Sequence, residues 1–198
     1  MTDAAAPAVV RFETVTGDED AGLLTAAERQ RRDLLRFAAD REAFVAAHVL
    51  VRRCAGALLG CDPAEIEIVQ RCAECGGPHG RPSVLGSPGV YVSLSHTRGW
   101  VAACAAFVPC GIDVEVIRPV APIASVLTGY ERAWMAAQPD AQATFLRLWV
   151  RKEALVKAGF GTLDHLAGLD ALRPPGQVSD WSGGDAVGAC AVARLSGN

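Results

Sequence analysis

Residues 90–115 read VYVSLSHTRGWVAACAAFVPCGIDVE. Apolar and polar residues alternate over 90–95, which is typical of a half-buried strand. A turn at Arg98-Gly99 leads into 100–108, an apolar run of the length expected for a strand buried on both faces. Residues 111–115 complete the segment as a further strand. The segment therefore predicts three consecutive strands.

Helical patterns lie on both sides of these strands. Residues 23–60 are expected to be helical, with Thr25 as the N-cap, Phe37 and Phe44 on the apolar face, and Gly60 at the end. The other expected elements are a strand at 65–70, a long loop at 72–89, helices at 123–137 and 141–158, and a strand at 186–195. The chain is therefore expected to contain both helices and strands.

The composition limits the classes of function. The chain has 198 residues, is 51% hydrophobic and carries a formal net charge of -3, which suits one compact unit and no nucleic-acid partner. The sequence predicts no membrane span, and its N-terminus lacks the basic start and apolar run of a signal peptide. Seven scattered cysteines favour a reducing compartment, so we expect a cytoplasmic protein.

Two carboxylates are spaced to share one face of a strand. Asp113 and Glu115 are two residues apart, so on a strand both point one way while Ile112 and Val114 pack inward. Close carboxylates repel each other, and a hard cation such as Mg²⁺ relieves that repulsion. The alternative is an ordinary solvated strand face.

Residues 145–157 place an aromatic and charged ridge on the expected helix. Phe145, Trp149, Glu153 and Lys157 recur at steps of four and therefore line one face. The ridge combines two aromatic residues of the kind that is usually buried with one acidic and one basic residue. This combination suggests that the charged end faces a partly enclosed site. The chain has 17 arginines and two lysines, and both lysines lie in this helix, which hints at a need for an ammonium group. A plain Glu153–Lys157 surface pair is the alternative.

A second polar group lies at loop and strand ends, where ligand contacts concentrate. Arg81, Pro82, Ser95 and His96 suit phosphate binding. A lone histidine can equally satisfy a local hydrogen bond.

One cysteine pair resembles half of a zinc site. Cys72, Cys75 and His79 supply three ligands, and no second Cys/His pair follows at a suitable spacing. The glycines around them fit equally well with a backbone that approaches a ligand closely.

Four motifs together resemble one family. They are His79-Gly-Arg-Pro82, Leu94-Ser-His96, Gly111-Ile-Asp-Val-Glu115 and residues 149–157, WVRKEALVK. Their order and spacing are similar to those of the 4'-phosphopantetheinyl transferases of the surfactin-synthetase-activating type. The resemblance implies two similar α+β halves related by a pseudo-twofold axis, which we place at residues 1–112 and 113–198, with coenzyme A and Mg²⁺ between them.

The resemblance also implies roles for individual residues. Asp113, Glu115 and Glu153 would bind the metal, and Glu153 is the candidate base, with Glu131 or water as alternatives. Lys157 would stabilise or protonate the leaving group. The residues expected to contact coenzyme A are Arg41, Arg81, Pro82, Ser95, His96 and Lys157.

The implied reaction moves 4'-phosphopantetheine from coenzyme A to a serine of an apo acyl or peptidyl carrier protein and releases adenosine 3',5'-bisphosphate. The family precedent suggests a monomer. Two alternatives are a Mg²⁺-dependent nucleotide or pyrophosphate hydrolase, which uses water as the nucleophile, and a zinc-stabilised interaction module built on Cys72, Cys75 and His79.

Overall fold

The structure is a computed structural model that describes residues 8–72, 75–77 and 80–194. Within these residues the chain forms two antiparallel sheets and four α-helices, which confirms the expected α+β class. The first sheet has the order β1-β5-β4-β3-β2 and the second the order β6-β8-β7. The strands are β1 Ala8–Thr14, β2 Ile68–Gln70, β3 Pro82–Val84, β4 Tyr91–Thr97, β5 Trp100–Ala106, β6 Cys110–Val116, β7 Gln177–Gly183 and β8 Ala186–Val192. The helices are α1 Ala26–Asp33, α2 Ala38–Leu59, α3 Gly129–Ala136 and α4 Ala141–Lys157, with 3-10 turns at Ala21–Leu23, Pro63–Glu65, Ala124–Val126 and Leu163–Gly168.

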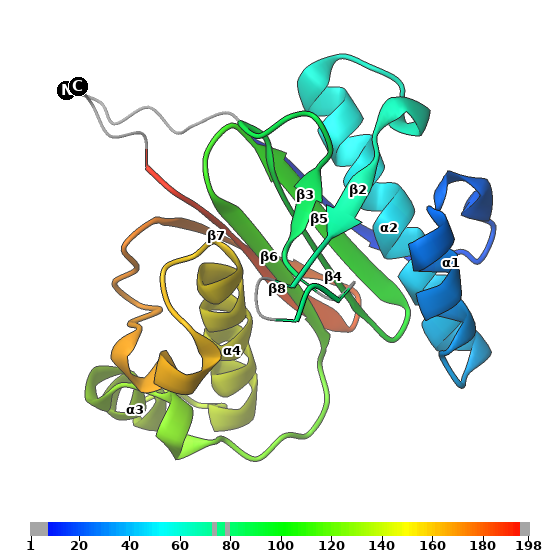
Figure 1. Cartoon of the computed structure of the whole chain (residues 1–198). Coiled ribbons are helices and arrows are strands. Elements are labelled where there is room, and N and C mark those ends of the chain that lie inside the picture. Colours follow the sequence, from blue (N-terminus) through cyan, green and yellow to red (C-terminus); the bar gives the residue numbers. More distant parts are fainter. Residues whose placement is uncertain (1–7, 73–74, 78–79, 195–198) are drawn as a thin grey trace.

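The elements stack in four layers, with α2 and α4 on the outside and the two sheets between them (Figure 1). The two faces of β5 show why. Val101, Ala103 and Ala105 pack against α2, whereas Ala102 and Cys104 join the core shared with β6 and β8. Small side chains allow both neighbouring layers to come close, so the prediction of a strand buried on both faces is confirmed.

The close contact between α4 and β6 depends on Gly111. A Cβ at this position would lie 2.1 Å from the carbonyl oxygen of Ala154 and 2.4 Å from the backbone nitrogen of Ala158. A larger residue would push α4 off the strand. Glycine therefore fixes the distance between the helix that carries Glu153 and the strand that carries Asp113.

The two halves repeat a second feature beside their long helices. Both α1 and α3 are eight residues long and begin with a threonine N-cap in a reciprocal capping box with a glutamate. In the first half this glutamate, Glu28, pairs with Arg52 of α2 at 2.7 Å, and in the second half Glu131 pairs with Lys152 of α4 at 2.9 Å. All four side chains are buried. The same arrangement thus occurs once beside each long helix. The expected division after residue 112 falls inside β6 and stays a prediction.

Some expected elements differ from the structure. The single helical stretch over 23–60 is wrong, because α1 and α2 are separated at 34–37 and the Phe37 side chain is 58% exposed. The cap at Thr25 and the end at Gly60 are confirmed, the latter with a left-handed φ of 73°. The region expected to be a loop over 72–89 contains β3. Two further strands, β1 and β7, were not expected from the sequence. Among the described helices, none combines the length and the apolar character that a bilayer crossing needs.

Candidate functional site

The candidate site lies where β4, β6 and α4 meet, and Asp113 is its centre. The Asp113 side chain is buried, and its Oδ1 accepts hydrogen bonds from the Ser95 hydroxyl at 2.8 Å and from Lys157 Nζ at 2.6 Å. Ser93, two residues earlier on β4, accepts from the backbone N–H of Ile112 at 3.2 Å. Two serines of one sheet therefore hold the strand of the other sheet that carries the acidic pair.

The predicted strand geometry of the acidic pair is confirmed. Ile112 and Val114 are 0% and 1% exposed and belong to the core between the sheets. Asp113 and Glu115 alternate with these two residues along the strand. Asp113 contacts Ser95, and the Thr97 hydroxyl is 3.5 Å from Glu115 Oε2.

The ridge on α4 also reaches this site. Phe145 is buried, Trp149 and Glu153 are half-buried, and the Lys157 side chain is 30% exposed. Phe145 and Trp149 line a pocket of about 210 Å³ that also contains Glu115. The aromatic part of the ridge thus lines this pocket, and its charged end reaches Asp113 through Lys157.

Electrostatics show that the three predicted metal-binding carboxylates affect one another. Burial, followed by the charge of Asp113, raises the pKa of Glu115 and also that of Glu153. Lys157 opposes both shifts. Arg118 also opposes the shift of Glu115, so burial and the charge of Asp113 together outweigh the nearby cations.

The donor set fits a hard divalent cation. Asp113 Oδ2 is buried without a hydrogen-bond partner among the described residues, and such atoms are rare in folded proteins. An oxygen-seeking ion such as Mg²⁺ would satisfy this atom and reduce the repulsion among the carboxylates. Within the described part of the chain, no three His, Cys, Asp or Glu side chains are already gathered around one point. Asp113, Glu115 and Glu153 therefore do not form a ready-made metal site in this arrangement.

Cationic side chains lie on the side of the site nearest the C-terminal end of α4. Arg81 is exposed, and its Nη2 donates to the carbonyl oxygen of Val156 at 3.2 Å, next to Lys157. Enclosure by surrounding protein lowers the pKa of His96, although the residue keeps exposed surface, and the charges of Lys157 and Arg31 lower it further while Asp40 raises it. His96 therefore lies among positive charges, which is an environment suited to an anion.

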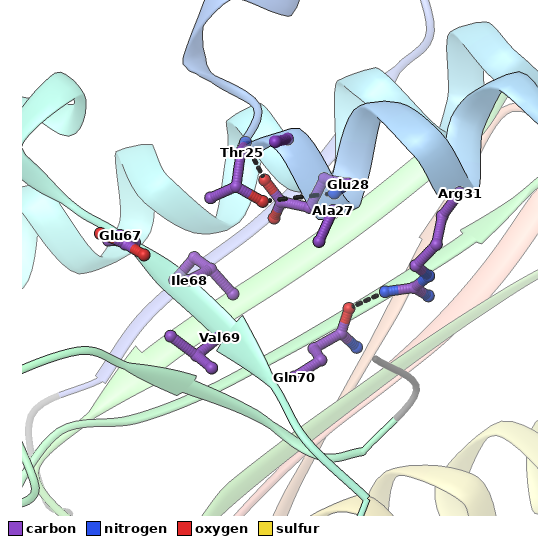
Figure 2. A pocket seen from close by; sticks show the side chains of 9 residues that line it. Thr25, Ala27, Glu28, Arg31, Glu67, Ile68, Val69 and Gln70 are labelled. Carbon is purple, nitrogen blue, oxygen red and sulfur yellow. Dashed lines mark hydrogen bonds between the residues drawn. The ribbon is translucent and has the colours of Figure 1, made fainter. Parts of the chain in front are cut away.

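Arg31 was absent from the sequence-based site. It lies on α1 and lines a pocket of about 320 Å³ between α1 and β2 (Figure 2). The cluster of arginines at 29–32 was the available signal, but only the fold brings one of them within electrostatic reach of His96.

Comparison with known proteins relates the chain to one family. The model of the 4'-phosphopantetheinyl transferase superfamily matches residues 109–183, which hold β6, α3, α4 and β7. The chain is 29% identical over 173 residues to a 4'-phosphopantetheinyl transferase of Bacillus subtilis, covering 82% of this chain and 74% of that protein. The chain is thus similar to 4'-phosphopantetheinyl transferases over most of its length. It is an enzyme of the transferase class.

Two further 4'-phosphopantetheinyl transferases align less completely. The chain is 33% identical to psf-1 of Bacillus pumilus over 51% of this chain and 46% of that protein. It is 29% identical to HetI of a Nostoc species over 77% of this chain and 65% of that protein. The chain thus spans less than two thirds of these two relatives.

Arg41 does not join the other predicted phosphopantetheinyl transferase site residues. Its guanidinium donates to the carbonyl oxygens of Leu35 at 2.8 Å and Arg36 at 3.3 Å, so it ties the connection between α1 and α2. It lines a separate pocket with Gly17 and Glu42. Pro82 opens β3 and pairs with Gln70, so it places Arg81 rather than contributing a polar group.

Glu131 cannot serve as the base, because it is 0% exposed and both of its oxygens are engaged. Oε1 accepts from the Ala171 N–H at 2.7 Å, and Oε2 accepts from the Thr128 N–H at 2.7 Å and pairs with Lys152. Lys152 is also 0% exposed and donates to the carbonyl oxygen of Leu166 at 2.8 Å and to that of Leu169. Of the two lysines, Lys157 therefore reaches the site and Lys152 holds α3 and α4 together.

The zinc prediction is not tested. The Gly76 N–H donates to the Cys72 carbonyl oxygen at 2.9 Å, and His79 lies outside the described residues.

Proposed function

We propose that this chain transfers the 4'-phosphopantetheine moiety of coenzyme A to a serine of an apo acyl or peptidyl carrier protein and releases adenosine 3',5'-bisphosphate. The observation that carries the proposal is the buried Asp113, which has one oxygen held by Ser95 and Lys157 and the other without a partner. Similarity to 4'-phosphopantetheinyl transferases supports this reaction class.

Asp113, Glu115 and Glu153 would bind Mg²⁺. When bound, the ion offsets negative charge on the pyrophosphate and orients its oxygens. The unpartnered Asp113 oxygen and the raised pKa values of the two glutamates support this assignment.

Lys157 and the residues around it would bind the phosphoadenosine part of the donor. The Lys157 ammonium would stabilise the departing phosphate or protonate it, which an arginine does poorly because it does not release a proton at ordinary pH. Arg81 and His96 would contact donor phosphates, and Arg31 extends the same cationic region. Ser95 already donates its hydroxyl proton to Asp113, so we assign it to holding that carboxylate.

Glu153 is the proposed base for the carrier serine. Its half-buried position and the nearby Asp113 charge raise its pKa in the metal-free protein, and a bound cation would lower that pKa again. No hydrogen bond within the described residues occupies its carboxylate, which leaves it available to a hydroxyl.

The proposed surroundings of the reaction follow from the sequence and remain predictions. They are a cytoplasmic monomer that acts without nucleic acid or a membrane, with a carrier of polyketide, peptide or fatty-acid type as the acceptor.

Intact-mass spectrometry of apo carriers tests the proposal directly. Carriers of all three types are incubated with the protein, coenzyme A and Mg²⁺, with an EDTA control. We expect the phosphopantetheine mass on a carrier, its loss with EDTA, and no addition by a folded Asp113→Asn variant. Release of adenosine 3',5'-bisphosphate without any carrier gain would favour the hydrolase alternative, and full transfer by Asp113→Asn would remove the site assignment.

A further inference from the structure

The amide of Gln70 on β2 is hydrogen-bonded at both ends. Arg31 Nη1 of α1 donates to its Oε1, as Figure 2 shows, and its Nε2 donates to the carbonyl oxygen of Gly80 at 3.2 Å. Guanidinium is a donor only and a carbonyl is an acceptor only, so these partners fix which end of the amide is oxygen. Gln70 therefore joins α1 to the segment that leads into β3.

One hydrogen bond of Gln70 ends on Arg31, and the other ends on the residue that precedes Arg81. Gly80 directly precedes Arg81, which reaches the Val156 carbonyl oxygen at the end of α4. The backbone at Gly80 is closely packed, because a Cβ there would lie 2.0 Å from the carbonyl oxygen of Arg71. A bond to the Gly80 carbonyl thus acts on a segment with little room to move.

Arg31 is held on a second side by an aromatic ring. Its guanidinium carbon lies 5.3 Å from the centroid of the Phe44 ring, and that ring stacks on His48 with centroids 3.9 Å apart. A free arginine side chain samples many rotamers, and fixing it before a ligand arrives lowers the entropy cost of binding. Gln70 and Phe44 together hold the guanidinium in one place.

The direction in which Arg31 acts is set by its neighbours. Burial is the main cause that lowers the pKa of His96, and the charges of Lys157 and Arg31 lower it further while Asp40 raises it. Arg31 is linked to the segment that bears Arg81 through the two hydrogen bonds of Gln70. Arg31 also lines the pocket between α1 and β2, which it shares with Gln70 (Figure 2). A doubly charged phosphate near His96 would be attracted by both cations.

We propose that Gln70 is a positioning residue that holds Arg31 and the Arg81-bearing segment in place to bind the terminal phosphomonoester of the donor. The inference rests on the proposed function, because it takes coenzyme A as the donor. Gln70 itself touches no reacting atom. Its removal changes recognition of the phosphomonoester and leaves the chemical step intact.

The test compares coenzyme A with 3'-dephospho-coenzyme A, which lacks that phosphate, for Gln70→Leu at saturating carrier. We expect the KM for coenzyme A to rise about tenfold, as expected for losing one charge-assisted hydrogen bond. The KM for the dephospho donor and kcat with either donor should stay within about twofold of the wild-type values. Gln70→Glu keeps an acceptor for Arg31 and loses the donor to Gly80, so its KM for coenzyme A should rise less.

Gln138→Leu is the matched control. Gln138 is half-buried near the end of α3, and its Nε2 donates to the Trp134 carbonyl oxygen at 3.3 Å, so the variant loses a similar bond. It should leave both KM values unchanged. An equal rise in KM for both donors, a fall in kcat with unchanged KM, or equal effects of Gln70→Leu and Gln138→Leu would overturn the proposal.

A binding measurement separates this inference from the proposed function. Calorimetry compares adenosine 3',5'-bisphosphate with adenosine 5'-monophosphate, and Gln70→Leu should weaken only the bisphosphate. Suppose that the wild-type protein binds the bisphosphate more tightly than Gln70→Leu does and still modifies no carrier. In that case the proposed reaction fails and the positioning role stands. If Gln70→Leu unfolds, Gln70→Glu is measured in the same way, and unchanged bisphosphate affinity in that folded variant refutes the role.

Discussion

Substituting Gly111 by alanine tests the geometry on which the site depends. The added Cβ would lie 2.1 Å from the Ala154 carbonyl oxygen and 2.4 Å from the Ala158 nitrogen. Non-bonded heavy atoms are most stable at about 3.5 Å, so α4 and β6 must separate by more than about 1 Å. The obstructing atoms are backbone, and no change of rotamer relieves the contact.

Two effects of Gly111→Ala follow from that displacement. Overpacking of this kind costs about 1–3 kcal/mol in the free energy of unfolding. Glu153 lies beside Ala154 on α4, and a misplacement of about 1 Å can lower turnover about a hundredfold. We therefore expect reduced stability together with a much larger relative loss of transfer.

Urea unfolding and the carrier mass assay measure the two effects separately. Gly89→Ala is the control, because a Cβ at Gly89 meets no atom within 4 Å, and it should behave as wild type. If Gly111→Ala kept wild-type stability and turnover, the close approach of α4 to β6 would be refuted. If it lost stability but kept turnover, the fold would stand and the placement of Glu153 as the base would be wrong.

Three further changes test other parts of the molecule. Glu131→Ala leaves the Lys152 ammonium buried without its carboxylate, so urea unfolding should show a loss of about 3–5 kcal/mol; a loss below about 1 kcal/mol would contradict the buried pair. Lys157→Arg keeps the charge but not a transferable proton, so kcat should fall at least about tenfold while the fold is retained, and an unchanged kcat would leave only an electrostatic role. Burial lowers the pKa of His48 to about 4, below its usual 6.5, so its contribution to stability is complete above pH 6.5 and is lost as the pH falls toward 4. The free energy of unfolding should drop by up to about 1.4 kcal/mol per pH unit in that window, and less in His48→Gln; identical slopes for both proteins would refute this source of acid sensitivity.

The sequence predicted those parts of the fold that have a local cause. Alternation over 90–95 and the two-residue spacing of Asp113 and Glu115 place side chains on defined faces of a strand, and both faces are confirmed. The cap at Thr25 follows from a side chain that bonds to its own helix. Such features need no knowledge of distant contacts.

Features that depend on contacts between distant segments were missed. β1 and β7 are edge strands with mixed, partly exposed sequences, so no clean alternation marks them. The interruption at 34–37 contains neither glycine nor proline and looks helical by propensity. Glu131 is buried by contacts with Lys152 and Ala171, and the spacing of charges does not reveal this.

The four-layer arrangement divides the site between the two sheets. The first half contributes Arg31, Arg81 and His96, and the second contributes the three carboxylates together with Lys157. Under the proposed function, most donor contacts therefore lie on the first half and the acidic centre lies on the second, with Lys157 of α4 taking part in both donor binding and the chemical step. A library confined to α1, β2 and β3 should change which nucleotide donors are accepted while leaving the acidic centre intact, which makes the first half the natural target for redesigning donor preference.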